Sequence, residues 1–187
     1  MKQGIRDRVS GKPAPRGASD AIQQRLIAQE WWPMGFQVGV YMATAREPKT
    51  SILLADLQAR GARIAVPVRR RQIYGWGWVT AETRWTQGAH GIREPALSEE
   101  ALTEELRVIV VPGVAFDAQG GRLGHGRGHF DRLLEESPAL LIGLCYENRL
   151  LEAVPMEPHD VRMDMVVTEK RTLFASDAAA KLERLTG

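Results

Sequence analysis

Residues 107–146, RVIVVPGVAFDAQGGRLGHGRGHFDRLLEESPALLIGLCY, contain two apolar runs separated by a glycine-rich segment and a short amphipathic stretch. The runs at 107–112 and 139–146 are far too short to cross a bilayer and are typical of strands buried on both faces. The stretch at 131–136 is expected to form a short helix. A strand, a helix and a second strand in this order indicate parallel pairing through a helical crossover.

The same alternation extends over the rest of the chain. Short apolar runs predict further buried strands at residues 36–42, 63–68 and 164–168. Residues 73–79 and the stretch near Trp85 are expected to form a hairpin or another β-rich segment.

Helices are expected between these strands, after residues that commonly cap a helix. They are placed after Ser19, after Thr50 with Gly61 as the stop, at 98–106, and after Ser176. Residues 1–187 are therefore predicted to form one α/β domain of three α/β/α layers around a mostly parallel sheet. In such sheets, ligands bind beyond the carboxyl ends of the strands.

The composition is that of a globular protein. The 187 residues are 44% hydrophobic and 26% charged, which excludes disordered, collagen-like and coiled-coil chains. The single cysteine, Cys145, excludes an internal disulfide framework and a cysteine-rich zinc site. The N-terminal residues lack the apolar segment of a secretory signal. The cytoplasm is the expected compartment, and a monomer is the default expectation.

Charge is distributed unevenly along the chain. Residues 1–93 contain 15 Lys and Arg against 6 Asp and Glu, a charge of +9, whereas residues 94–187 contain 10 against 17, a charge of −7. This division favours an anionic ligand on the first half. The cations are 20 Arg and 5 Lys, a bias that a GC-rich genome explains equally well. RNA binding through residues 69–71 is a competing hypothesis, which predicts a strongly salt-dependent affinity.

The glycine-rich segment is the most informative part of the sequence. Five glycines fall within nine residues, at positions 120, 121, 124, 126 and 128. Glycine permits a positive φ and close approach of a ligand, and successive free N–H groups form an anion-binding nest. The segment is neither a Walker A loop nor a GxGxxG motif. Phosphate binding and a mobile turn both remain open, and Asp131 is either a magnesium ligand or a helix cap.

Residues 111–134, VPGVAFDAQGGRLGHGRGHFDRLL, resemble the signature of 5-formyltetrahydrofolate cyclo-ligases, V-P-G-x-A-F-D-x-x-G-x-R-L-G-x-G-x-G-Y-Y-D-R. Other elements similar to those of this family follow in the same order. They are Lys2-x-x-Ile5-Arg6, Glu47-x-x-Thr50, GIREP at 91–95, IGLCY at 142–146, and PMEPHD at 155–160 with Asp164 and VTE at 167–169. The departures are His129-Phe130 in place of Tyr-Tyr, Arg127, and a Pro/Gly-rich stretch at 10–17.

The resemblance implies a Rossmann-like fold of the NagB/RpiA-like type. It also implies ATP- and Mg²⁺-dependent conversion of 5-formyltetrahydrofolate to 5,10-methenyltetrahydrofolate with release of ADP and phosphate. The implied route is phosphorylation of the formyl oxygen followed by ring closure by N10. The expected partners are these small molecules, and neither nucleic acid nor a membrane is expected.

The resemblance also implies roles for individual residues, with Arg122 as the catalytic cation. The residues implied to bind ATP are Lys2, Arg6, Arg122, Leu123, Gly124, His125, Gly126, Arg127, Gly128, His129 and Phe130. Those implied to bind the folate are Met42, Glu47 and Trp78, although Trp78 reads equally well as a strand-face aromatic. Those implied to bind magnesium are Asp131 and Asp164.

Several other interpretations are possible. The change to His129-Phe130 suggests a catalytically weak relative that binds folate or nucleotide without turnover. His125 and His129 are spaced for a zinc ion, although no third ligand is evident. His159 and Asp160 suit either an acid–base pair or a turn-stabilising hydrogen bond. Cys145 lies in an apolar run, which favours a buried structural thiol over a nucleophile.

Overall fold

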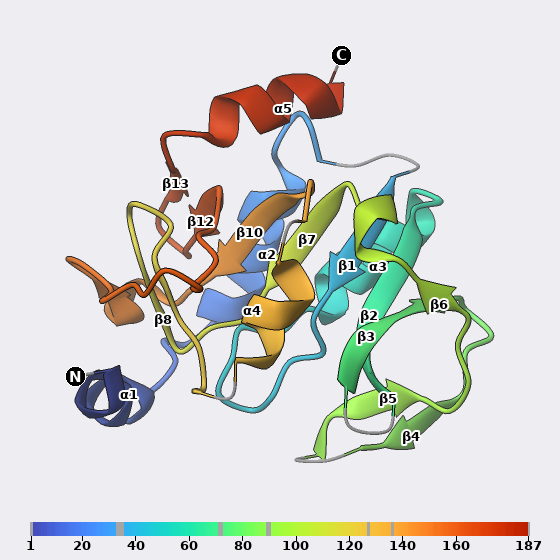
Figure 1. The fold of residues 1–187 in the computed structure, drawn as a ribbon, viewed down its shortest axis with the longest axis horizontal. Helices are drawn as coiled ribbons and strands as arrows, with labels where there is room; N and C mark the ends of the chain where they lie inside the picture. Colours follow the sequence, from blue (N-terminus) through green and yellow to red (C-terminus); the bar gives the residue numbers. More distant parts are fainter. Residues whose placement is uncertain are drawn as a thin grey trace.

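An eight-stranded sheet runs through the middle of the protein in the computed structural model (Figure 1). The structure describes residues 2–32, 36–70, 73–88, 91–126, 128–135 and 137–186. From one edge to the other, the strands are β13 (Thr172–Phe174), β12 (Met165–Val167), β10 (Leu140–Leu144), β7 (Val108–Val111), β1 (Gln37–Val40), β2 (Arg63–Arg70), β3 (Ile73–Val79) and β6 (Glu100–Ala101).

The five central strands, from β12 to β2, run parallel to one another. The remaining strands, β13 at one edge and β3 and β6 at the other, pair antiparallel. Every residue of β7 and β10 is buried. Strands covered on both faces can be apolar at every position, which explains the continuous apolar runs of the sequence. The predicted α/β fold with a mostly parallel sheet is confirmed.

Helices cover both faces of the sheet. The helices are α1 (Lys2–Ser10), α2 (Ala18–Ile27), α3 (Ser51–Ala59), α4 (His129–Leu134) and α5 (Ala178–Thr186), with 3₁₀ turns η2 (Thr103–Glu105) and η3 (Glu147–Arg149). Val9 of α1 packs apart from the central sheet, in a cluster with Ala115 and Leu123. On one face, Leu26 of α2 and Leu185 of α5 join the same apolar cluster as Val110 of β7. On the other, Leu134 of α4 packs in a cluster with Ile109 (Figure 1). No helix in the described ranges has both the length and the apolar composition to cross a membrane.

Two smaller sheets flank the central one. β8 (Ala115–Asp117) lies between β11 (Leu150–Leu151) and β9 (Arg122–Leu123). β4 (Trp85–Gln87) and β5 (Arg93–Pro95) form a separate hairpin. The β-rich segment after β2 is therefore present. Its longest strand, β3, pairs with β2 along seven residue pairs rather than with the strand at Trp85.

The helix ends partly follow the predicted signals. Thr50 occupies the N-cap position of α3, and Gly61, with a φ of 70°, follows the end of this helix. In contrast, α2 begins after Gly17 rather than after Ser19. The Ser19 hydroxyl instead accepts a hydrogen bond from the backbone N–H of Lys49 at 2.7 Å, so it joins two segments of the chain.

The helix predicted at residues 98–106 is wrong. This stretch contains the two-residue strand β6 and the 3₁₀ turn η2. Ala101 is 4% exposed and pairs with Trp76 of β3. Pairing at the sheet edge therefore outweighs the helix propensity of this glutamate-rich stretch, which is only a weak preference.

Candidate active site

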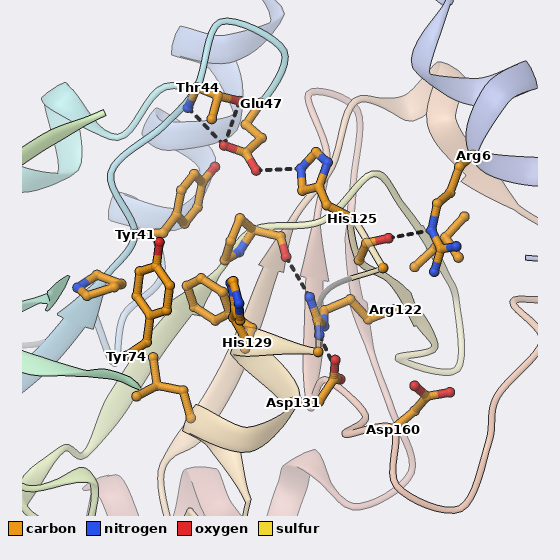
Figure 2. Close-up of a pocket in the computed structure, with 18 of the residues that line it drawn as sticks. Arg6, Tyr41, Thr44, Glu47, Tyr74, Arg122, His125, His129, Asp131 and Asp160 are labelled. Carbon is orange, nitrogen blue, oxygen red and sulfur yellow. Dashed lines mark hydrogen bonds and ion pairs between the residues drawn. The ribbon is translucent and has the colours of Figure 1, made fainter. Parts of the chain in front are cut away.

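A cavity of about 520 Å³ opens where β1, β2 and β7 end. Much of its wall comes from α1, the loop after β1, the start of β3, the glycine-rich loop with α4, and the segment at residues 157–160 (Figure 2). Pro67 of β2, Pro112 after β7, and Ile92 and Glu94 of the β4–β5 hairpin complete it. Parallel strands bring their carboxyl ends to one edge of a sheet, and this is where the α/β fold predicts a ligand.

Helix α1 is fixed beside this cavity by its apolar side. Ile5 and Val9, one helical turn apart, pack in a cluster with Leu123 of β9. Lys2 and Arg6, also one helical turn apart, lie on another side of α1 and line the cavity wall. The Nε of Arg6 donates a hydrogen bond to the carbonyl oxygen of Gly124 at 2.8 Å (Figure 2). The structure therefore brings both predicted N-terminal cations to the cavity, and Arg6 to the glycine-rich loop itself.

Lys2 forms ion pairs with two acidic side chains of the cavity wall. Its Nζ lies 2.5 Å from Asp160 Oδ2 and 2.6 Å from Glu157 Oε2. Burial favours the neutral amine, but the hydrogen bonds to Asp160 and Glu157 outweigh it and raise the pKa of Lys2. Burial likewise opposes ionisation of Asp160, and the contact with Lys2 outweighs it, so the pKa of this carboxyl is lowered. The positive charge of Lys2 is thus balanced by two carboxylates at the cavity wall.

The turn that leads into the glycine-rich loop is built on Asp117. This carboxylate is 3% exposed and accepts hydrogen bonds from the backbone N–H groups of Gln119, Gly121 and Val154 at 2.7–2.9 Å. A Cβ on Gly121 would lie 2.3 Å from Asp117 Oδ2, so this position requires glycine. Asp117 therefore fixes the start of β9, from which Arg122 projects. No role was predicted for Asp117 from the sequence.

The glycine-rich loop uses positive φ at some of its glycines. Gly120, Gly126 and Gly128 have φ values of 82°, 90° and 62°. At Gly126 an added Cβ would lie 3.2 Å from Cζ of Arg6, so both conformation and space favour glycine there. Gly128 occupies the N-cap position of α4, and no side chain caps this helix. Capping by Asp131, one of the two sequence interpretations, is therefore not observed.

Arg122 and Asp131 form a largely buried ion pair in the cavity wall. The Nη2 of Arg122 lies 2.7 Å from Asp131 Oδ1, and its Nη1 donates to the carbonyl oxygen of Pro112 at 3.2 Å (Figure 2). The side chains are 4% and 18% exposed. The buried Nε of Arg122 has no hydrogen-bond partner. A guanidinium held in this way keeps donors available for an anion.

Glu47 is buried at the end of the loop that follows β1. Its Oε2 accepts hydrogen bonds from the N–H and the hydroxyl of Thr44 at 2.8 and 2.9 Å. Its Oε1 lies 3.1 Å from Nε2 of His125 (Figure 2). Burial disfavours the charged form, but the hydrogen bonds from His125 and Thr44 outweigh it and lower the pKa of Glu47. Glu47 is therefore a carboxylate at neutral pH.

An aromatic wall lies on the same side of the cavity as Glu47, and it contains Tyr74 rather than Trp78 (Figure 2). The rings of Tyr74 and His129 lie 4.6 Å apart between centroids. Trp78 pairs with Ala65 near the amino end of β2, carries the Arg63 guanidinium 4.0 Å from its ring, and is absent from the cavity lining. The predicted folate contact of Trp78 is therefore corrected: it is a strand-face aromatic.

Asp164 is also misplaced in the sequence prediction. It precedes β12, and its Oδ2 accepts hydrogen bonds from the backbone N–H of Leu141 at 2.7 Å and from Lys181 Nζ at 2.8 Å. These contacts join the amino ends of two strands to α5, and Asp164 does not line the cavity. The expectation that it binds magnesium is therefore not supported. Asp160, four residues earlier, lines the cavity instead.

The other predicted residues take varied positions. Met42 is half-buried at the cavity wall. Leu123 is 1% exposed and packs in the core, so only its backbone is available to a ligand. Phe130 lines the cavity and meets the Trp76 ring edge-on at 6.4 Å. Arg127 lies outside the described residues.

The interpretations of the histidines and the cysteine can also be compared with the structure. His125 contacts Glu47 and His129 stacks on Tyr74, so the two imidazoles have separate partners. Among the described residues, Glu157, His159 and Asp160 have ligand atoms within 4.8 Å of one another. Cys145 is 3% exposed, and burial raises the pKa of its thiol to about 12, as a structural thiol requires.

The chain is similar in sequence and structure to known proteins. The sequence model of the 5-formyltetrahydrofolate cyclo-ligase family matches residues 4–169. A 5-formyltetrahydrofolate cyclo-ligase of Mycolicibacterium smegmatis is 37% identical over 177 residues, covering 86% of this chain and 90% of that protein. The structure of a 5,10-methenyltetrahydrofolate synthetase from Aquifex aeolicus superposes with a TM-score of 0.84 at 28% identity, covering 94% of this chain and 93% of that one. A synthetase from Mycoplasma pneumoniae shares the fold at 17% identity, with a TM-score of 0.68 and coverage of 90% and 96%. The chain belongs to the 5-formyltetrahydrofolate cyclo-ligase family.

Proposed function

We propose that this protein catalyses the ATP- and Mg²⁺-dependent cyclisation of 5-formyltetrahydrofolate to 5,10-methenyltetrahydrofolate, releasing ADP and phosphate. Family membership supports the overall reaction. The observation that carries the mechanism is that one cavity is lined on one side by Glu47 and Tyr74 and on another by Arg122, Asp131 and Asp160. A cavity of this kind can hold a heteroaromatic ring and a polyphosphate against each other.

The chemistry explains why ATP is needed. The N5-formyl group is an amide whose carbonyl is stabilised by resonance, and N10 is a weak arylamine nucleophile. The formyl oxygen attacks the γ-phosphorus of ATP and displaces ADP, which leaves an electrophilic carbon bearing a phosphate. N10 then bonds to this carbon, the C–O bond breaks to release phosphate, and N10 loses its proton. Positioning and charge stabilisation are the protein's contribution to such a transfer.

The glycine-rich loop and Arg122 supply these two contributions. Arg122 places its charge at the cavity wall in an orientation fixed by Asp131 and by the Pro112 carbonyl oxygen. In this role it stabilises the charge that develops on the transferred phosphoryl group. The backbone N–H groups of Gly124, His125, Gly126 and Gly128 are suited to bind phosphate oxygens, and Lys2 and Arg6 approach the triphosphate from α1.

The acidic side chains fit a magnesium ion. Mg²⁺ is bound by oxygen ligands, usually one or two carboxylates together with substrate phosphates. Asp131 and Asp160 supply such oxygens at the cavity wall, and Lys2 already places a positive charge against Asp160. When bound, the ion neutralises phosphate charge and increases the leaving tendency of ADP. We assign Asp131 and Asp160 as the carboxylates that hold it.

The folate binds on the opposite side of the cavity. Pterin N–H groups suit the Glu47 carboxylate, because its pKa is lowered and it accepts hydrogen bonds. Met42 and Tyr74 provide apolar and aromatic surface against the ring. His129 stacks on Tyr74 where family members carry tyrosine, so the aromatic wall persists without the hydroxyl.

The test is the formation of methenyltetrahydrofolate, followed by its ultraviolet absorbance, with and without ATP. Arg122→Lys keeps the charge but loses the planar fork, and we expect its turnover to fall by about 10³-fold. Arg149→Lys is the matched control, because Arg149 is also 6% exposed, donates to two backbone carbonyls and does not line the cavity. The control is expected to lose stability and keep its turnover at saturating substrate.

Thermal unfolding of each variant separates loss of chemistry from loss of fold. Product that forms without ATP, or unchanged turnover of Arg122→Lys, would refute the proposed roles of ATP and Arg122. Tight folate binding with no ATP-dependent product in the wild-type protein would support the alternative, a catalytically weak relative.

A further inference from the structure

His125 connects the two sides of the cavity. Its imidazole extends from the glycine-rich loop to the loop after β1, across 78 positions of sequence, and its Nε2 lies 3.1 Å from Oε1 of Glu47 (Figure 2). On the proposed function, the first loop holds the triphosphate and Glu47 holds the pterin. The contact therefore joins the two substrate subsites directly.

His125 is the contact that orients one of the two oxygens of the Glu47 carboxylate. Thr44 supplies two donors to Oε2, and His125 is the partner of Oε1. An ionised carboxylate offers about four lone-pair sites, so these contacts leave about one acceptor site on Oε1 for a ligand N–H. Because Glu47 is ionised, the shared hydrogen is donated by Nε2 of His125.

The imidazole makes this contact without belonging to the core. The side chain of His125 is 53% exposed, whereas that of Glu47 is 6% exposed. Loss of the imidazole therefore opens no internal cavity. The backbone on one side of His125 is held separately, by the hydrogen bond from Arg6 to the carbonyl oxygen of Gly124. Removing the imidazole thus frees Oε1 of Glu47 and one attachment of the loop, while Thr44 still holds Oε2 and Arg6 still holds the loop at Gly124.

We propose that His125 is a positioning residue that couples folate binding to nucleotide binding through its hydrogen bond to Glu47. The coupling rests on the proposed function of the two loops. A folate that binds Glu47 and favours its hydrogen bond to His125 also favours the loop geometry that accepts phosphate. By linkage, a nucleotide bound to the loop then favours folate binding to the same extent. Each substrate is therefore expected to tighten the binding of the other.

The experiment measures the affinity for 5-formyltetrahydrofolate by titration calorimetry, with and without magnesium and a nonhydrolysable ATP analogue. The ratio of the two dissociation constants is the coupling factor, expected to be about fivefold or more in the wild-type protein. His125→Ala is expected to bring this factor close to one and to raise the KM for folate by about tenfold, the size of one lost hydrogen bond to a charged group. The kcat is expected to change less than the KM.

Two further variants make the result specific. His125→Gln keeps an N–H donor at a similar reach and is expected to restore most of the coupling. Arg171→Ala is the matched control, because it removes another exposed side chain, 2.7 Å from the Glu147 carboxylate, outside the cavity. Its coupling factor is expected to equal that of the wild-type protein. All three variants are expected to unfold at nearly the wild-type temperature.

The inference is overturned if the wild-type protein shows no coupling, if His125→Ala keeps the wild-type factor, or if His125→Gln behaves like the alanine variant. Failure of the proposed function has a different signature. In that case the wild-type protein forms no ATP-dependent product, whatever residue occupies position 125.

Discussion

Replacing Asp164 with asparagine tests whether this carboxylate is structural, as its contacts indicate. The asparagine oxygen can still accept the hydrogen bond from the Leu141 N–H, but the charge opposite Lys181 is lost. Asp164 and Lys181 side chains are 8% and 23% exposed, so this pair is partly solvated. Breaking a fully buried pair costs 3–5 kcal/mol, and a hydrogen bond to a charged group about 1.5–3 kcal/mol. We expect a loss of about 2 kcal/mol.

For a protein of this size, such a loss lowers the melting temperature by about 4–8 °C. The assay combines thermal unfolding by circular dichroism with the Mg²⁺ dependence of turnover. Asp164→Asn is expected to lower the melting temperature and leave the Mg²⁺ requirement unchanged. Asp160→Asn, the matched variant at the cavity wall, is expected to raise the required Mg²⁺ concentration by about tenfold or more. An altered Mg²⁺ dependence of Asp164→Asn at unchanged stability would refute this reasoning and restore Asp164 as a metal ligand.

Three further predictions follow from individual side chains. Tyr74→Ala should raise the KM for folate by about tenfold, while Trp78→Phe should leave it within about twofold; the reverse order in steady-state assays would return Trp78 to the site. Cys145, with its pKa raised to about 12 by burial, should react with Ellman's reagent at pH 8 about a thousandfold more slowly in the native than in the unfolded protein, and fast native labelling would disprove this burial. The pKa of Glu47 is lowered from 4.5 on folding, so the unfolded chain binds more protons and the stabilisation present above pH 4.5 is lost as the pH falls below it. Glu47→Gln should flatten the dependence of the unfolding free energy on pH in that range, and an unchanged dependence in denaturant titrations would show that Glu47 is not the group responsible.

The sequence predicted the centre of the sheet well because burial on both faces leaves a direct pattern. The run of apolar residues at 108–111 has few alternatives in a chain of this length. The glycine-rich loop was equally readable, because glycines at this density are needed where φ is positive or space is short. Gly121 lacks space for a side chain, and Gly126 has a positive φ.

The predictions for Trp78 and Asp164 failed because the position of each residue in the sheet depends on long-range strand pairing. Tyr74, Trp76 and Trp78 occupy every second position of β3 and so share one face of the strand. The sequence does not say which of them lies at the edge of the sheet where the cavity opens. β3 runs antiparallel to β2, so its first residues lie at the carboxyl edge and Trp78 lies away from it. Similarly, Asp164 directly precedes a parallel strand and therefore lies at the amino edge.

The contacts between some site residues left no signal in the sequence. The pairing of His125 with Glu47 joins positions far apart in sequence, and periodicity carries no information about such contacts. Asp117 belongs to the quoted signature, but no role was predicted for it, although it holds three backbone N–H groups. The turn that Asp117 organises precedes the segment that presents Arg122.

The central claim is that the loop at residues 122–130 holds the triphosphate beside the folate. A crystal structure of the protein with magnesium, a nonhydrolysable ATP analogue and 5-formyltetrahydrofolate tests it most directly. We predict phosphate oxygens against the backbone N–H groups of this loop and against Arg122, with the formyl oxygen facing the γ-phosphate. A nucleotide bound elsewhere, with the loop facing solvent, would contradict the account.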